Sequence, residues 1–214
     1  MTAVNLSLDF STSGIVNNPR QPALSSGFAA LDVMLPHNGW PIGAITEIFC
    51  PEPSQFALPL VLPALARLSQ AKRWLAMIAP PNAPTASHLK SQGIDISQVL
   101  IIHPHATSNG LWAVERALRA GTCAAVLSWV NNADHHAMQD LRGAALAGNC
   151  CGIIFRPEWA ITQPGAASQY SAASQRLRLT PTADHGIYVE LLEQHSTRAR
   201  SALFIEARQL HRDA

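Results

Sequence analysis

Short apolar segments alternate with longer amphipathic segments through most of this 214-residue chain, and this alternation limits the fold more than any other feature. The segments with the length and apolar content of buried strands are 44–49, 73–80, 98–104, 123–130 and 150–157. The segments with apolar residues at helical spacing are 58–68, 88–94, 111–121 and 138–149. Strands that alternate with helices form βαβ units, so the sequence predicts an α/β fold with a doubly wound, mostly parallel sheet.

The C-terminal part follows a different pattern. Segments 175–181 and 186–194 flank the turn sequence TADH, which is typical of a hairpin, and segment 201–207 predicts a last strand. Residues 160–175 contain mostly small and polar side chains that cannot build a core. We therefore expect antiparallel strands to finish the sheet after a long connection.

The N-terminal part is polar and lacks periodicity. Residues 1–24 contain proline and asparagine breakers and no regular apolar spacing, so we expect a flexible arm. The regular pattern begins with a serine cap and a short helix at residues 25–35. The expected organisation is thus an arm over residues 1–24 and one domain over residues 25–214.

The composition favours a protein that binds other proteins in the cytoplasm. Hydrophobic residues make up 48% and charged residues only 14%, so the surface is poor in charge and suits coverage by a partner. The net charge of +1 provides no concentrated positive field for nucleic acid. No apolar stretch is long enough to cross a bilayer, and the start has no signal-peptide pattern, which predicts a cytoplasmic protein without membrane contact.

Neither the cysteines nor the histidines have the spacing of a metal site. Cys50, Cys123, Cys150 and Cys151 form no C-x-x-C pair, and we interpret them as reduced core residues. The nine histidines have no cysteine or carboxylate at matching ligand spacing and are interpreted as surface or loop residues. The sequence therefore predicts no metal and no cofactor.

The loop between the strand at 44–49 and the following helix is the natural phosphate site of such a fold. A working phosphate loop uses glycines, a lysine and a hydroxyl group to hold nucleotide and magnesium. In this sequence, Cys50, Gln55, Phe56 and Ala57 occupy those places. The loop has therefore lost the side chains that bind phosphate.

Residues 25–52, SSGFAALDVMLPHNGWPIGAITEIFCPE, resemble the corresponding segment of the RecA family. The resemblance implies a RecA-like fold, and it aligns the acidic residue that activates water with Pro81 and the magnesium-binding aspartate with Trp129. The hypothesis that follows is a degenerate RecA-like domain that is not an enzyme.

The middle of the chain is similar to the SulA family of SOS-induced cell-division inhibitors. The resemblance rests on residues 59–81 with the Arg73-Trp74 pair, the SQGI turn at 91–94, and residues 117–130 and 148–157. It implies binding to the tubulin-like division protein FtsZ. The lead-in at 25–46 and the C-terminal hairpin segment depart from this family.

The lead-in, the degenerate loop, the SulA-like middle and the arginine-rich tail in combination resemble the ImuA family, which supports error-prone translesion DNA synthesis during the SOS response to DNA damage. This resemblance implies binding to an ImuB-type Y-family polymerase homologue and an error-prone polymerase, and it is our main hypothesis. The alternative is a SulA-type inhibitor that binds FtsZ, and the third hypothesis is a RecA-like nucleotide-dependent enzyme. A homo-oligomer and direct contact with DNA remain open.

The candidate partner contacts are Arg73, Trp74, Trp112 and Phe56. For Trp74, as for Trp129, burial within a strand is the favoured interpretation, whereas burial and exposure are equally expected for Trp112. Arg73 is either a partner contact, as the SulA resemblance implies, or a solvated residue. Phe56 either fills the vacated phosphate pocket or presents an apolar anchor, and the loop at 160–175 is either a connector or a DNA contact flanked by arginines.

Overall fold

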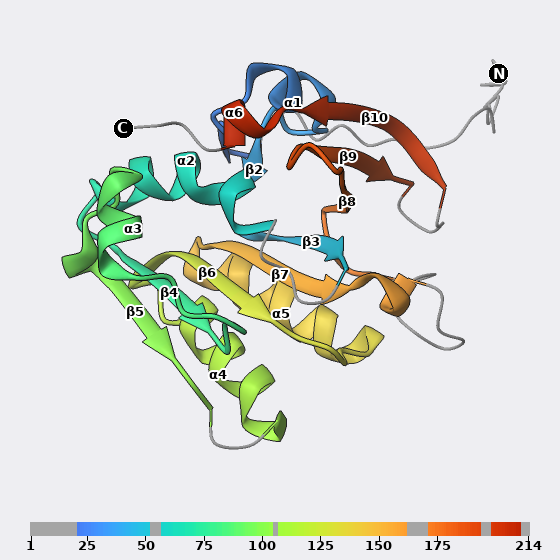
Figure 1. The fold of residues 1–214 in the computed structure, drawn as a ribbon. Helices are drawn as coiled ribbons and strands as arrows, with labels where there is room; N and C mark the ends of the chain where they lie inside the picture. The colour runs from blue at the N-terminus through green and yellow to red at the C-terminus, as the bar shows by residue number, and fades with distance from the viewer. Residues whose placement is uncertain (1–20, 52–56, 105–106, 162–170, 194–197, 211–214) are drawn as a thin grey trace, which may run out of the picture.

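The computed structural model of the chain describes residues 21–51, 57–104, 107–161, 171–193 and 198–210. Its centre is an eight-stranded sheet with the strand order β10-β9-β8-β3-β7-β6-β4-β5 (Figure 1). The strands are β3 (Ala44–Cys50), β4 (Trp74–Ile78), β5 (Val99–Ile102), β6 (Cys123–Trp129), β7 (Cys151–Pro157), β8 (Gln175–Pro181), β9 (Ile187–Leu192) and β10 (Ala199–Ile205).

Every neighbouring pair from β8 across to β5 is parallel, whereas β9 is antiparallel to both β8 and β10. The expectation of a mixed α/β fold with a mostly parallel sheet and antiparallel C-terminal strands is therefore confirmed. The turn between β8 and β9 is the predicted hairpin, closed by a hydrogen bond from the Thr182 amide to the Gly186 carbonyl. His185 has a φ of 59°, the left-handed conformation that completes a three-residue hairpin loop.

Helices cover both faces of the sheet (Figure 1). One face packs against α1 (Ala29–Met34), α2 (Ala57–Ser69) and α3 (Ala86–Ser91), and the other against α4 (Thr107–Arg119) and α5 (His135–Gly148). The chain runs outward from β3 to β4 and β5 through α2 and α3, and it returns to β6 and β7 through α4 and α5. Short helical turns η1 (Ile96–Gln98) and η2 (Glu158–Ile161) and the helix α6 (Ala207–Leu210) complete the described elements.

Alternation along the central strands explains why they are apolar throughout. Ile48 of β3 belongs to the core cluster under α1 and α2, whereas Ile45 belongs to the cluster under α4 and α5. A strand covered on both faces has no solvent side, so it needs no polar alternation. No helix within the described ranges is long and apolar enough to cross a bilayer.

A small two-stranded ladder precedes the main sheet. Its strands, β1 (Ala23–Leu24) and β2 (Trp40–Pro41), pair antiparallel, and Trp40 is fully buried. Residues 21–24 of the expected arm are thus held against the domain. Residues 1–20 lie outside the described part of the chain.

Candidate interaction surface

The loop that the sequence predicts to be a degenerate nucleotide loop begins at the carboxyl end of β3, beside β7. Cys50 ends β3 and Ala57 begins α2, and both side chains are buried. The Cys50 thiol lies 3.8 Å from the carbonyl oxygen of Arg156 on the neighbouring strand. Gln55 and Phe56 lie outside the described residues, so the two interpretations of Phe56 both stay predictions.

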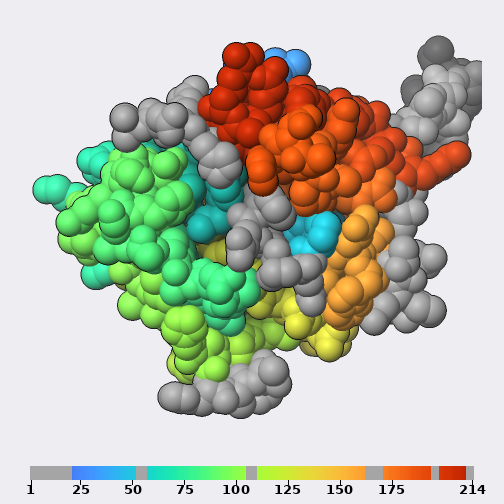
Figure 2. Space-filling view, viewed as in Figure 1, coloured from blue at the N-terminus to red at the C-terminus, as the bar shows by residue number. Residues whose placement is uncertain are grey.

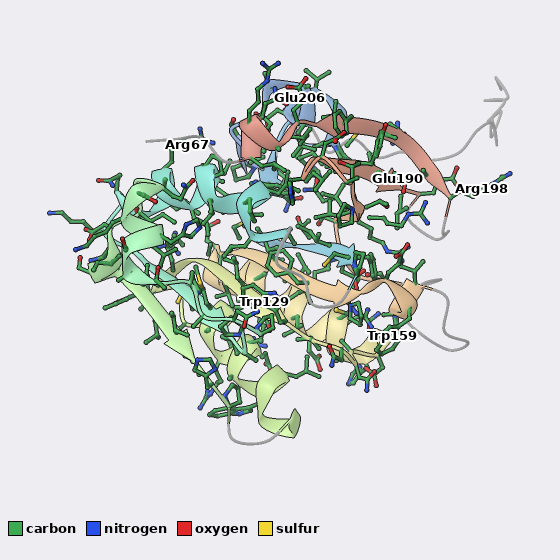
Figure 3. All side chains as sticks on the ribbon, in the orientation of Figure 1. Arg67, Trp129, Trp159, Glu190, Arg198 and Glu206 are labelled. Atoms are coloured by element: carbon green, nitrogen blue, oxygen red, sulfur yellow. The ribbon has the colours of Figure 1, made fainter. Side chains whose placement is uncertain are left out.

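The positions aligned with the two acidic residues also lie at this edge. Trp129, labelled in Figure 3, ends β6. Its ring stacks on Phe155 of β7 with the centroids 4.8 Å apart. Pro81 follows β4 and is exposed. An indole stacked in the core and a proline ring supply neither a magnesium ligand nor a base that could activate water.

Among the described residues, the four cysteines are buried and form no disulfide. Burial raises the pKa of the Cys151 thiol to about 12, and burial also raises the pKa of Cys150. Thiols that stay protonated are poor nucleophiles and poor metal ligands. Within the described ranges, no three His, Cys, Asp or Glu side chains lie together as a metal site would require.

A buried ionic cluster that was not predicted joins three strands of the sheet. Glu47 of β3 accepts hydrogen bonds from Arg156 Nη1 of β7 at 2.8 Å and from the Ser171 hydroxyl at 2.5 Å. Arg176 Nε of β8 lies 3.4 Å from the second carboxylate oxygen of Glu47. Both guanidinium groups also lie over the Phe49 ring. The signal in the sequence was a glutamate inside an apolar strand, with an arginine inside each of two other strands.

The ionic cluster bears on whether the arginines beside the 160–175 segment can bind the phosphate backbone of DNA. Arg156 and Arg176 are buried against Glu47, and Arg178 of β8 forms a bidentate pair with Glu190 of β9 at 2.6 and 2.9 Å. Arginines that are buried or paired with carboxylates offer little charge to a phosphate backbone. Residues 162–170 of that segment lie outside the described part of the chain.

Arg73 lies at the border where α4 and α5 end. Its Nη2 atom is within hydrogen-bonding distance of the backbone carbonyl oxygens of Gly121, Cys123, Gly148 and Asn149, at 2.6–3.4 Å. Gly121 and Asn149 have φ values of 70° and 47°, as residues that follow a helix end often do. A positive charge at two helix C-termini is favourable, so Arg73 holds this corner together.

Three large apolar side chains on β4, the edge strand β5 and α4 are exposed. Trp74 is 43% exposed, Leu100 44% and Trp112 61%. Leu75 and Val99 face the α2 side, so alternation directs Trp74 and Leu100 to the face on which α4 packs. We call Trp74, Leu100 and Trp112 the β5-edge surface.

Two features of the β5-edge surface bear on the earlier expectations. The guanidinium group of Arg116 lies over the Trp112 ring, 5.3 Å from its centroid. The favoured burial of Trp74 is wrong, because Trp74 is the first residue of β4 and lies at the border of the sheet. Large exposed aromatic rings with a stacked arginine are typical of binding surfaces.

Comparisons with known proteins match the middle of the chain. The family model described as "Cell division inhibitor SulA" matches residues 43–152. The chain is similar to the cell division inhibitor SulA of Yersinia pestis (strain Pestoides F), with 32% identity over 115 residues that cover 54% of this chain and 68% of that protein. It is also similar to SulA of Serratia marcescens, with 29% identity over 116 residues, 54% of this chain and 69% of that protein. The crystal structure of SulA from Pseudomonas aeruginosa aligns with a TM-score of 0.45 and 28% identity, covering 52% of this chain and 97% of that chain.

The family model and the SulA relatives contradict the main hypothesis of an ImuA-type accessory role in translesion synthesis, and that expectation is wrong. The comparisons give no support to the expected ImuB-type polymerase partner. The matched range 43–152 contains the degenerate loop and most of the SulA-like middle, whereas the two features that set the ImuA hypothesis apart from SulA, the lead-in and the tail, lie largely outside it. The kinship to RecA stays a prediction from the sequence.

Proposed function

The chain belongs to the SulA family of cell division inhibitors, and from this premise we propose that it blocks bacterial division during the SOS response by binding FtsZ. In this proposal the chain acts in the cytoplasm by occupying a surface of its partner. It carries out no reaction of its own. This is the alternative function that the SulA resemblance in the sequence implied.

The position of the β5-edge surface supports this proposal most directly. Trp74, Leu100 and Trp112 all lie within the range 43–152 that matches the family. Tryptophan and arginine side chains contribute a large share of the binding energy at many interfaces. The Trp112–Arg116 stack orders two long side chains before binding, which lowers the entropy lost when a partner covers them.

The carboxyl edge of the sheet supports a role without catalysis. The Trp129–Phe155 stack and the buried Cys50 lie where a nucleotide enzyme of this architecture needs phosphate and metal ligands. We therefore propose that binding alone accounts for the inhibition.

Expression in growing bacteria and reconstitution with purified FtsZ test the proposal together. Induced expression should produce filamentous cells, and the purified chain should reduce the amount of FtsZ polymer that sediments with GTP. Trp112→Ala should weaken FtsZ binding by about tenfold or more, because anchors of this type contribute 2 kcal/mol or more at many interfaces.

Trp159→Ala is the matched control for this experiment. Trp159 is 42% exposed but lies in η2, outside the range that matches the family. The Trp159→Ala variant should bind FtsZ as tightly as the unchanged chain does. Normal division and normal polymer yield at saturating protein would overturn the proposed function, and equal losses for both tryptophan variants would overturn the assignment of the surface.

A further inference from the structure

The free edge of β10 lies in a part of the molecule that the family match does not include. The match ends at residue 152, whereas β8, β9 and β10 follow it and extend the sheet beyond β3. Among the described residues, no strand pairs with the outer side of β10. Figure 2 shows the β10 segment, in red, at the surface along one border of the molecule.

The direction of the backbone groups of β10 follows from the hairpin before it. The bond from the Thr182 amide to the Gly186 carbonyl marks a hydrogen-bonded pair, and such pairs alternate along an antiparallel ladder. Tyr188 and Glu190 therefore bond to β8, and Val189, which lies between them, bonds to β10. In the register of β9 and β10, Val189 pairs with Leu203, so the backbone groups of Ala202 and Phe204 point to the free edge.

The regular part of this edge is short and has clear limits. A bulge between Ala199 and Ser201 ends it on one side, and β10 ends at Ile205 on the other. No proline or lysine, two residue types that often protect edges, occurs between these limits. Phe204 is 40% exposed, and its ring packs on Tyr188 with the centroids 4.9 Å apart.

We propose that a second copy of the chain pairs with this edge, antiparallel and symmetric about Leu203. Leu203 is the midpoint of the regular segment from Ser201 to Ile205. In this register Ala202 of each copy faces Phe204 of the other, and each pair exchanges two backbone hydrogen bonds through groups that point outward. The two sheets then continue as one.

The side chains of this register complement one another. Each exposed Phe204 ring lies beside a small Ala202, which leaves room for it. Arg200 is the bulge residue and Glu206 follows β10, so the arginine of one copy comes near the glutamate of the other just beyond each end of the regular segment. Glu206 also pairs with Arg208 of its own chain, and opposite charges close to each other across the pairing are favourable. The site is distinct from the β5-edge surface, because β10 and β5 are the two opposite edges of the sheet.

Sedimentation equilibrium of the full chain tests the pairing, and the expected species is a dimer. Ala202→Pro removes a backbone donor that points outward, so it should weaken the dimer by about tenfold or more while the β9–β10 ladder keeps its bonds. Ala202→Val keeps the donor and is the matched control, and it should stay dimeric. Circular dichroism and the melting temperature of the proline variant check that it remains folded.

Charge reversal tests the register itself. Arg200→Glu and Glu206→Arg should each weaken the dimer, and the double variant should restore it because the opposite charges face each other again. A monomer at all concentrations, a proline variant that dimerises like the unchanged chain, or a double variant that fails to recover would overturn the proposal. FtsZ binding by Ala202→Pro should be unchanged, so this proposal and the proposed function can fail separately.

Discussion

Arg156 Nη1 donates a 2.8 Å hydrogen bond to Glu47 Oε1, and the two side chains are only 3% and 0% exposed. A second guanidinium group, that of Arg176, shares the same carboxylate at 3.4 Å. One buried negative charge thus faces two buried arginines, and burial lowers the pKa of Arg176 while the nearby Glu47 raises it. The carboxylate therefore connects β3, β7 and β8 at the point where the C-terminal strands join the sheet.

Glu47→Gln should strongly destabilise the fold. The substitution keeps the shape of the side chain but leaves two guanidinium groups without a buried counter-charge, which costs about 3–5 kcal/mol when one partner of a buried pair is lost. Urea denaturation measures the change in the free energy of unfolding. Glu190→Gln is the matched control, because its pair with Arg178 is partly exposed and should contribute only about 1 kcal/mol. Equal losses for the two variants would show that the cluster is no more important than a surface pair.

The Arg178–Glu190 pair should make stability depend on pH in the acid range. The hydrogen bonds from Arg178 hold the pKa of Glu190 below its ordinary value of 4.5, which burial opposes. A carboxyl group whose pKa is lower in the folded state than in the unfolded state stabilises the fold at pH values above its unfolded-state pKa. That contribution is lost as the pH falls through its folded-state pKa. The difference in unfolding free energy between the unchanged chain and Glu190→Gln should therefore be constant above pH 4.5 and shrink below it. A difference that persists at the acid end would contradict an electrostatic origin.

The parts of the fold that sequence patterns predict are those set by local apolar content. Segment 123–130 is apolar throughout, and it forms the buried strand β6, while the TADH turn closes the expected hairpin. Glu47 escaped notice because one glutamate in a strand does not reveal which distant arginines share its face. The exposure of Trp74 depends on where α4 ends relative to the start of β4. The local sequence around Trp74 does not predict this relative position.

Arg73→Ala should lower stability, because the carbonyls around the guanidinium group, those after α4, at the start of β6 and at the end of α5, lose the donor that they share. The expected loss is about 1–3 kcal/mol, measured by urea denaturation, and Arg73→Lys should recover part of it as a point charge. FtsZ binding, measured well below the melting temperature, should change little. Unchanged stability with lost binding would instead assign Arg73 to the partner contact that the family resemblance implied.

Magnesium-ATP should give no saturable heat in titration calorimetry at millimolar nucleotide. The chain has no lysine between Cys50 and Ala57 to contact a phosphate, and the aligned acidic positions are Pro81 and Trp129. Saturable binding, or ATP turnover that a Glu52→Gln substitution abolishes, would contradict the absence of nucleotide chemistry.

Two glycines of α5 should respond in opposite ways to the same substitution. A Cβ atom added at Gly148 would lie 1.8 Å from the Leu118 carbonyl oxygen, a backbone atom of α4, whereas one added at Gly143 would meet nothing within 4 Å. Gly148→Ala must therefore push the ends of α4 and α5 apart, and we expect a loss of several kcal/mol, on the order of the largest single-residue effects.

Gly143→Ala should raise stability by about 0.5–1 kcal/mol, because alanine loses less backbone entropy than glycine when a helix forms. Thermal and urea denaturation of both variants measure the two changes. The corner that Gly148 occupies is also the one that Arg73 spans, so Gly148→Ala should reduce the further effect of Arg73→Ala in the double variant. Strictly additive losses would mean that the close packing of the two helices and the arginine contacts stabilise the corner independently.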